Sequence, residues 1–167
     1  MSKAFISEET VEHGPITRGP PTLQPGEVRY ITPEGFAALQ ANLAKAREER
    51  AEAMQLPEEE RAAALNELDQ RIAFYEATIA SLTVLSPDDA PEGRVAFGTW
   101  VTIEDEEGTE TTWRIVGPDE ADPRHGRLSV HSPVARALMG RAVGETVEVR
   151  RPTGDGELTV MAVRKHP

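Results

Sequence analysis

Cysteine is absent from the 167-residue sequence, and so is any long apolar run. Without cysteine, disulfides and thiolate metal sites are excluded, which fits a reducing compartment. No apolar run approaches the roughly 20 residues that a membrane-spanning helix needs, and the first residues lack the apolar core of a signal peptide. We therefore expect a cytoplasmic protein that makes no membrane contact.

Positive charge is also scarce. The chain has 18 lysines and arginines against 29 aspartates and glutamates, which gives a net charge of −11. An acidic chain binds nucleic acid poorly, because it must hold phosphates against its own electrostatic field. We expect no direct sequence-specific binding of nucleic acid. A basic protein surface or a metal ion matches this charge better.

The motifs of common enzyme classes are missing as well. Ser132 does not lie in a Gly-x-Ser-x-Gly context, and no glycine-rich phosphate loop precedes a predicted helix. Metal-ligand spacing is absent among the four histidines, which are His13, His125, His131 and His166. The sequence therefore predicts no catalytic residue, no metal site and no cofactor of the chain's own.

A heptad pattern dominates the middle of the chain. Apolar residues alternate three- and four-residue steps at Leu65, Leu68, Ile72, Tyr75, Ile79 and Leu82, with polar residues, including Thr78, between them. This a/d spacing predicts a helix that packs along its length against another helix. Three heptads on one helix need a partner, and the segment from Phe36 to Met54 carries a matching seam.

Capping residues and prolines indicate where both helices begin and where the first one ends. Thr32 suits the N-cap of the first helix, and Pro33 suits its first position. The residue before Pro57 is disfavoured in a helix, so one helix ends near Met54 and another starts after the proline. Glu58, Glu59 and Glu60 then occupy a first turn, where acidic residues are favoured. The seams on both sides of this short break predict an antiparallel hairpin of helices about 30–35 Å long.

The remaining segments divide the chain into four parts. Residues 1–29 form a flexible arm rich in proline and glycine, and residues 30–85 form the coiled-coil hairpin. Residues 86–93 form a linker without regular structure. Residues 94–167 form a small antiparallel β domain with one short helix. Its strands are expected at 100–104, 111–116, 127–130, 146–150 and 158–163, and its helix at 132–139, with Ser132 as the cap.

Several motifs of the second half give the chain a family resemblance. Their residues are Phe97–Val101, Ile115–Gly117, Asp119–Asp122, Ser132–Gly140 and Val143–Gly144, preceded by Ile31–Phe36 at the start of the hairpin. In this order and at close to this spacing, they resemble the GreA/GreB family of bacterial transcription elongation and transcript-cleavage factors. The likeness covers roughly Tyr30 to Arg164.

The resemblance implies an α+β fold: an N-terminal antiparallel coiled coil followed by an FKBP-like β domain. It also implies a partner, bacterial RNA polymerase. In this family the β domain grips the rim of the polymerase's secondary channel, and the match places this contact on Ser132, Pro133, Ala135 and Arg136. The coiled coil enters the channel, where an acidic tip helps to hold the polymerase's second Mg²⁺. The factor is an accessory protein, because the polymerase itself hydrolyses the transcript.

The tip of the hairpin departs from the family pattern. The family signature, with Asp and Glu beside an Asn-Ala, has no match between Met54 and Leu65. The hairpin also looks shorter than the family's by about one heptad per arm, or roughly 10 Å. In this it is similar to shortened Gre-like proteins, including the Rnk type and inhibitory Gre homologues.

Three functions follow from these observations. The first is a monomeric factor that binds the secondary channel and modulates elongation or initiation without stimulating cleavage. The second is a true cleavage factor in which Glu58, Glu59 and Glu60 share Mg²⁺ with the polymerase. The third is an interaction scaffold that self-associates through the hairpin, with Met54 and Leu56 extending the contact.

Overall fold

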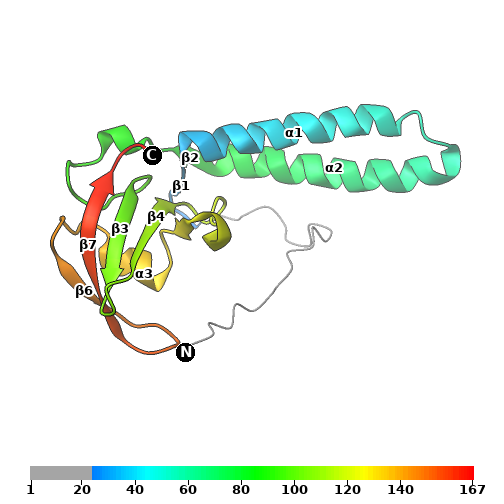
Figure 1. Ribbon diagram of the computed structural model, residues 1–167. Coiled ribbons are helices and arrows are strands. Elements are labelled where there is room, and N and C mark those ends of the chain that lie inside the picture. Colours follow the sequence, from blue (N-terminus) through cyan, green and yellow to red (C-terminus); the bar gives the residue numbers. More distant parts are fainter. Residues whose placement is uncertain (1–23) are drawn as a thin grey trace.

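Two long helices form a hairpin that projects from a curled β domain (Figure 1). The computed structural model describes residues 24–167. Most of the predicted arm, residues 1–23, lies outside the described residues. The order of elements, two helices followed by a sheet with one short helix, confirms the predicted α+β class. Within residues 24–167, no helix is both long and apolar enough to cross a lipid bilayer.

The hairpin consists of α1 (Pro33–Ala53) and α2 (Glu58–Ser81), of 21 and 24 residues. The Thr32 side chain accepts a hydrogen bond from the Gly35 N–H, and Pro33 lies at the first helical position, which confirms the predicted start of α1. The second helix begins at Glu58, directly after Pro57, as the sequence predicts.

The two helices pack through a narrow apolar seam flanked by ion pairs. Leu68 is buried, and the other predicted seam residues of α2 are half-buried. The partner face on α1 uses small residues, Ala46 and Ala53. Three ion pairs join the helices: Arg47–Glu76 at 2.7 Å, Arg50–Asp69 at 2.5 Å and Arg71–Glu49 at 2.8 Å. Each exposed pair contributes only about 0–1 kcal/mol, so the apolar seam supplies most of the hairpin's stability.

Thr78, one of the polar residues between the seam positions, is buried rather than exposed to solvent. Its side chain is 1% exposed, and its hydroxyl has no hydrogen-bond partner among the described residues. A helix packed on one side and joined to a domain at its base buries residues beyond its a/d seam. Thr78 lies near that base, three residues before the end of α2.

Thr78→Val is expected to raise the free energy of unfolding by about 1–2 kcal/mol, because valine has the same shape and removes an unpaired buried hydroxyl. Urea unfolding followed by circular dichroism measures the change. Thr78→Ser is the control, since it keeps the hydroxyl and loses a methyl group. A less stable valine variant would show that the hydroxyl is paired in solution.

A small parallel sheet closes the base of the hairpin. Strand β1 (Arg29–Ile31) precedes α1 and β2 (Leu82–Val84) follows α2, and the two pair in register from Arg29 opposite Leu82. The Leu85 N–H then donates to the Ile31 carbonyl at 2.9 Å. Sequence patterns did not indicate this sheet, because three residues are too few to show a period of two.

The β domain is built on a five-stranded sheet in the order β5-β4-β3-β7-β6. Its strands are β3 (Trp100–Asp105), β4 (Glu110–Val116), β5 (Arg127–Ser129), β6 (Thr146–Val149) and β7 (Gly156–Arg164). The prediction of a purely antiparallel sheet is wrong at one edge, because β5 pairs in parallel with β4. The connection between them is long enough to carry the chain back along β4 before β5 begins.

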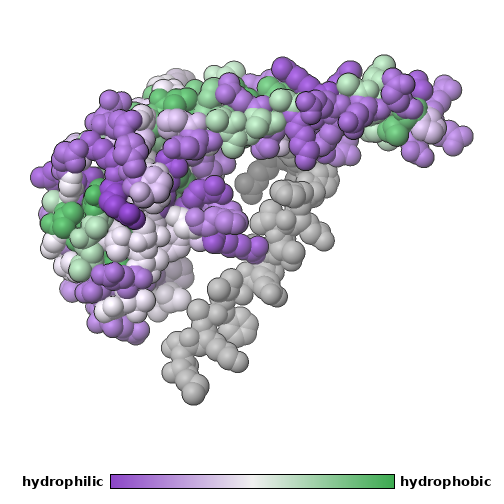
Figure 2. All heavy atoms as spheres, turned by 45° about the horizontal axis from the view of Figure 1, so that its top comes forward, coloured by the Kyte–Doolittle hydropathy of each residue, from purple (hydrophilic) through white to green (hydrophobic). Residues whose placement is uncertain are grey.

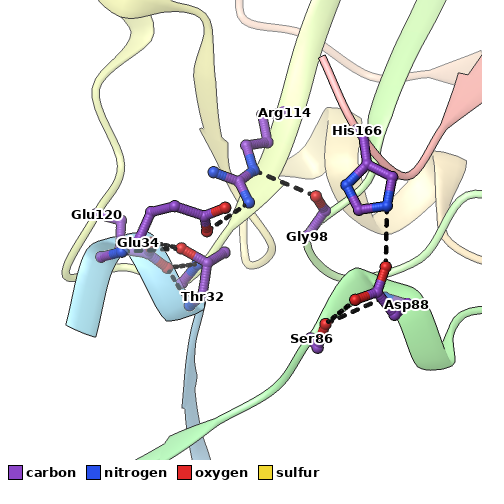
Figure 3. A network of polar contacts seen from close by, with 10 residues as sticks. Thr32, Glu34, Ser86, Asp88, Gly98, Arg114, Glu120 and His166 are labelled. Atoms are coloured by element: carbon purple, nitrogen blue, oxygen red, sulfur yellow. Dashed lines mark hydrogen bonds and ion pairs between the residues drawn. The ribbon is translucent and has the colours of Figure 1, made fainter. Parts of the chain in front are cut away.

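The predicted linker 86–93 also contains a regular turn. Ser86 caps a short 3-10 helix, η1 (Pro87–Asp89), by accepting from the Asp88 N–H. The prediction missed it because a proline that breaks an α-helix is well suited to the first position of a short turn. His166, near the C-terminus, contacts the Asp88 carboxylate at 3.0 Å and ties η1 to the end of β7 (Figure 3). A second 3-10 helix, η2 (Pro123–His125), lies between β4 and β5.

Helix α3 (Pro133–Leu138) covers the core of the sheet. Ala135 and Leu138 are fully buried there, and Gly140 follows with a positive φ of 77° that only glycine adopts without strain. The strand residues of the same core are Val101, Ile103, Ile115, Val147, Val149, Leu158 and Val160. The predicted capped helix is thereby confirmed.

Candidate functional site

The surface of α3 is the first candidate site. The Ser132 hydroxyl accepts from the Ala135 N–H at 3.1 Å, which fixes the start of the helix. Pro133 and Arg136 are exposed, and the Arg136 guanidinium has no ion-pair partner within residues 24–167. Ala135 is 0% exposed, so its side chain packs the helix onto the sheet and cannot contact a partner. Of the four residues that the resemblance predicts, Pro133 and Arg136 are thus the exposed ones, and their contact with a partner stays a prediction.

A hollow lies next to the start of α3. It has a volume of about 290 Å³ and is lined by Glu27, Val28, Arg29, Tyr30, Pro118, Val130 and His131. Val28 is 53% exposed and Tyr30 is 40% exposed, so the hollow presents apolar side chains among its charged ones. Sequence reasoning missed it because its two halves are about 100 positions apart in the chain.

The tip of the hairpin is the second candidate site. Residues 54–57 form the turn, and the Arg61 guanidinium holds it by donating to the Leu56 carbonyl at 2.9 and 3.1 Å. Glu58, Glu59 and Glu60 follow, all exposed and without an ion-pair partner among the described residues. Figure 2 shows that hydrophilic side chains cover much of the hairpin. The three adjacent exposed carboxylates give the tip a negative charge that faces any partner.

The three tip glutamates do not form a metal site by themselves. Consecutive residues of a helix point about 100° apart, so three in a row do not converge on one ion. In the part of the chain that the structure describes, no group of three or more His, Asp or Glu residues is placed to hold a metal ion. Carboxylate oxygens are suitable ligands for Mg²⁺, but here they can only add to a site that a partner supplies.

The start of α1 is joined to the β domain by a polar network (Figure 3). The Glu120 carboxylate accepts hydrogen bonds from the Thr32 N–H at 3.0 Å, from the Thr32 hydroxyl and from the Gly117 N–H at 3.2 Å. Beside it, Arg29 makes a bidentate pair with Asp119 at 2.5 and 2.6 Å. We call this set of contacts the junction.

Arg114 forms a second link between the helix start and the β domain. Its guanidinium lies 4.1 Å from the centre of the Trp100 ring, donates to the Gly98 carbonyl at 3.2 Å and pairs with Glu34 at 2.9 Å. Burial is the largest single effect and acts to raise the pKa of Glu34. The hydrogen bond and the charge of Arg114, together with hydrogen bonds from the helix backbone and from Thr32, outweigh it and leave that pKa below its ordinary value of 4.5.

Glu34→Gln is expected to flatten the acid side of the stability profile. A carboxyl with a lowered pKa stabilises the fold above about pH 4.5 and loses this contribution as it is protonated at lower pH. The wild-type chain should therefore lose more stability than the glutamine variant between pH 5 and about pH 3, by no more than about 1 kcal/mol for so exposed a pair. Urea unfolding at each pH measures the difference, and parallel profiles would contradict the pairing.

Comparison with known proteins identifies the family of the chain. Residues 90–165 match the family described as transcription elongation factor, GreA/GreB, C-terminal. A transcription elongation factor GreB from Yersinia pestis is 37% identical over 153 residues, covering 83% of this chain and 90% of that protein. The chain belongs to the GreA/GreB family. The likeness thus extends beyond the β domain to the hairpin.

Two further comparisons concern this GreA/GreB family member. A transcription elongation factor GreA from Anaeromyxobacter is 46% identical over 97 residues, which is 58% of each chain. The crystal structure of GreA factor homolog 1 (Gfh1) of Thermus thermophilus is 25% identical and covers 83% of this chain and 99% of that one. Its TM-score is only 0.39, so family membership rests on the sequence relatives.

Proposed function

We propose that this chain binds bacterial RNA polymerase at its secondary channel and modulates elongation or initiation as an accessory factor. The observation that carries the proposal is the combination of family membership with a hairpin that projects from the β domain. Helices of 21 and 24 residues extend about 30–35 Å, which suits a narrow channel better than a flat surface.

The β domain supplies the affinity in this proposal. Pro133 and Arg136 stand exposed on a helix that is capped at Ser132 and anchored in the core by Ala135 and Leu138. A rigid element of this kind presents its surface without an ordering cost on binding. The hairpin then contributes direction and reach, and its negative charge favours a basic channel.

The tip decides what the bound factor does. We propose that it occupies the channel without stimulating transcript cleavage, because the family's Asp-, Glu- and Asn-containing signature has no counterpart between Met54 and Leu65. A factor that fills the channel without a metal-binding tip slows or redirects the polymerase. No catalytic residue of the chain's own is needed, and a monomer suffices.

A second candidate function is supported by one observation. Glu58, Glu59 and Glu60 are exposed at the far end of the hairpin and are not engaged in ion pairs with described residues. One or two of these carboxylates are therefore free to approach an Mg²⁺ ion held by the polymerase. In that case the chain is a true cleavage factor with a rebuilt tip.

Backtracked elongation complexes distinguish the two candidates. With the wild-type chain we expect no stimulation of transcript cleavage and a saturable change in elongation, both read from the same samples. The triple variant Glu58→Gln, Glu59→Gln, Glu60→Gln should still bind. Its association should slow by up to about tenfold at low salt, since part of the steering charge is gone.

Stimulated cleavage that disappears in the triple variant, with binding retained, would favour the second candidate. The absence of any effect together with the absence of polymerase binding would overturn both. Glu104→Gln, Glu106→Gln, Glu107→Gln, at and beside the β3–β4 turn, is the control for a general loss of three negative charges.

A further inference from the structure

The junction binds the β domain to one end of one helix. Thr32 is both the N-cap of α1 and the residue that Glu120 holds through its N–H and its hydroxyl. Thr32 is 0% exposed, so Glu120 takes the place of water as the partner of both groups. The position of the first turn of α1 is therefore tied directly to the segment that follows β4.

Two glycines show how closely these segments approach. A Cβ at Gly35 would collide with the Glu120 carboxylate, and a Cβ at Gly117 would collide with the Tyr30 carbonyl oxygen. Neither glycine has a positive φ, so backbone conformation does not explain glycine at these positions. Close contact between the helix start and the β domain does explain it.

The remaining polar contacts fall in the same place. Arg29 pairs with Asp119, and Glu34 pairs with Arg114. Arg29 and Glu34 lie on either side of Thr32, within a stretch of six residues. The end of α2 is held differently: β2 pairs only with β1, which itself belongs to this stretch. The polar contacts that join the two helices themselves to the β domain are thus gathered at the start of α1.

Small changes at this point are magnified at the tip. A rotation of about 10° at the base would displace the tip, about 30 Å away, by about 5 Å. A displacement of that size removes a side chain from any contact it makes in a channel.

We propose that Glu120, supported by the Arg29–Asp119 pair, is a positioning residue that sets the direction of the hairpin and thereby places the tip in the secondary channel. This inference rests on the proposed function. Loss of the Glu120 carboxylate leaves the α3 surface intact. Polymerase affinity should then be kept while the effect on elongation is lost. The Asp119–Asp122 motif then has a role of its own, distinct from the partner-binding surface on α3.

The test combines a distance with a functional measurement. Because the chain has no cysteine, Gln55→Cys and Arg164→Cys introduce a single pair of labelling sites, at the tip and at the end of β7. Pulsed electron spin resonance on the free protein then reports the direction of the hairpin. Polymerase affinity and the maximal effect on elongation are measured on the same variants without labels.

Glu120→Ala should broaden or shift the distance distribution, leave polymerase affinity within about threefold, and lower the maximal effect at least tenfold. Glu120→Gln should restore both, because its carbonyl can accept from the two N–H groups while its amide donates to the Thr32 hydroxyl. Glu148→Ala, an exposed carboxylate on β6, is the control.

Arg29→Gln is the second variant, in case Glu120→Ala does not fold, and it should change the distance distribution in the same direction. An unchanged distribution and an unchanged maximal effect in both variants would overturn the inference. A parent chain that does not bind polymerase would overturn the proposed function instead, and the distance measurement would still decide whether the junction directs the hairpin.

Discussion

Replacing Arg136 by glutamate is expected to weaken binding to bacterial RNA polymerase at least tenfold. Arg136 is exposed on α3 and has no ion-pair partner among the described residues, so its charge is available to a partner. Reversing a charge inside an interface replaces an attraction by a repulsion, which costs several kcal/mol when the groups are desolvated. Titration of labelled polymerase with the variant measures the change.

Arg150→Glu is the matched control, because Arg150 is an exposed arginine of the same domain beyond the end of β6. Its effect should stay within about twofold. Pro133→Ala should weaken binding less than Arg136→Glu. If both α3 variants bind as the wild-type chain does, the partner surface lies elsewhere, and the hollow beside β1 becomes the next surface to test.

Replacing Leu138 by alanine is expected to lower the free energy of unfolding of the β domain by about 2–5 kcal/mol. Leu138 is 0% exposed and packs α3 against the sheet, so its truncation leaves a cavity in the core. Both tryptophans, Trp100 and Trp113, lie in this domain, and their fluorescence during urea unfolding reports its stability separately from the hairpin.

Val143→Ala is the control for this change, because Val143 is 50% exposed and its truncation should cost less than about 0.5 kcal/mol. The leucine variant should also lose polymerase binding at temperatures where the domain is partly unfolded. A loss of stability below about 1 kcal/mol would contradict the placement of Leu138 in the core.

Local signals in the sequence were sufficient for the helices. Thr32 with Pro33 and Ser132 with Pro133 each combine a side-chain cap with a proline that suits the first helical position, and both helices begin there. The heptad seam predicted a partnered helix, and Pro57 marked the turn between α1 and α2. These features depend on residues within one or two turns of each other, so they can be read without the fold.

Contacts between distant segments were not predictable in the same way. The parallel pairing of β5 with β4 depends on the path of the intervening loop, and the burial of Thr78 depends on how the hairpin meets the domain. The resemblance carried Ala135 into the site as one residue of a matching motif, although its side chain faces the core. Glu120 and Thr32 are 88 positions apart, so the sequence indicated the motif around each residue but not the contact between them.

Photocrosslinking from the tip tests the central claim most directly. A benzophenone attached to Gln55→Cys, the only cysteine in that variant, would be activated in a complex with bacterial RNA polymerase. The account predicts crosslinks to the catalytic subunits around the secondary channel, and fewer of them when Glu120→Ala is added. Crosslinks confined to the outer surface of the polymerase, or none under conditions in which the complex is intact, would contradict it.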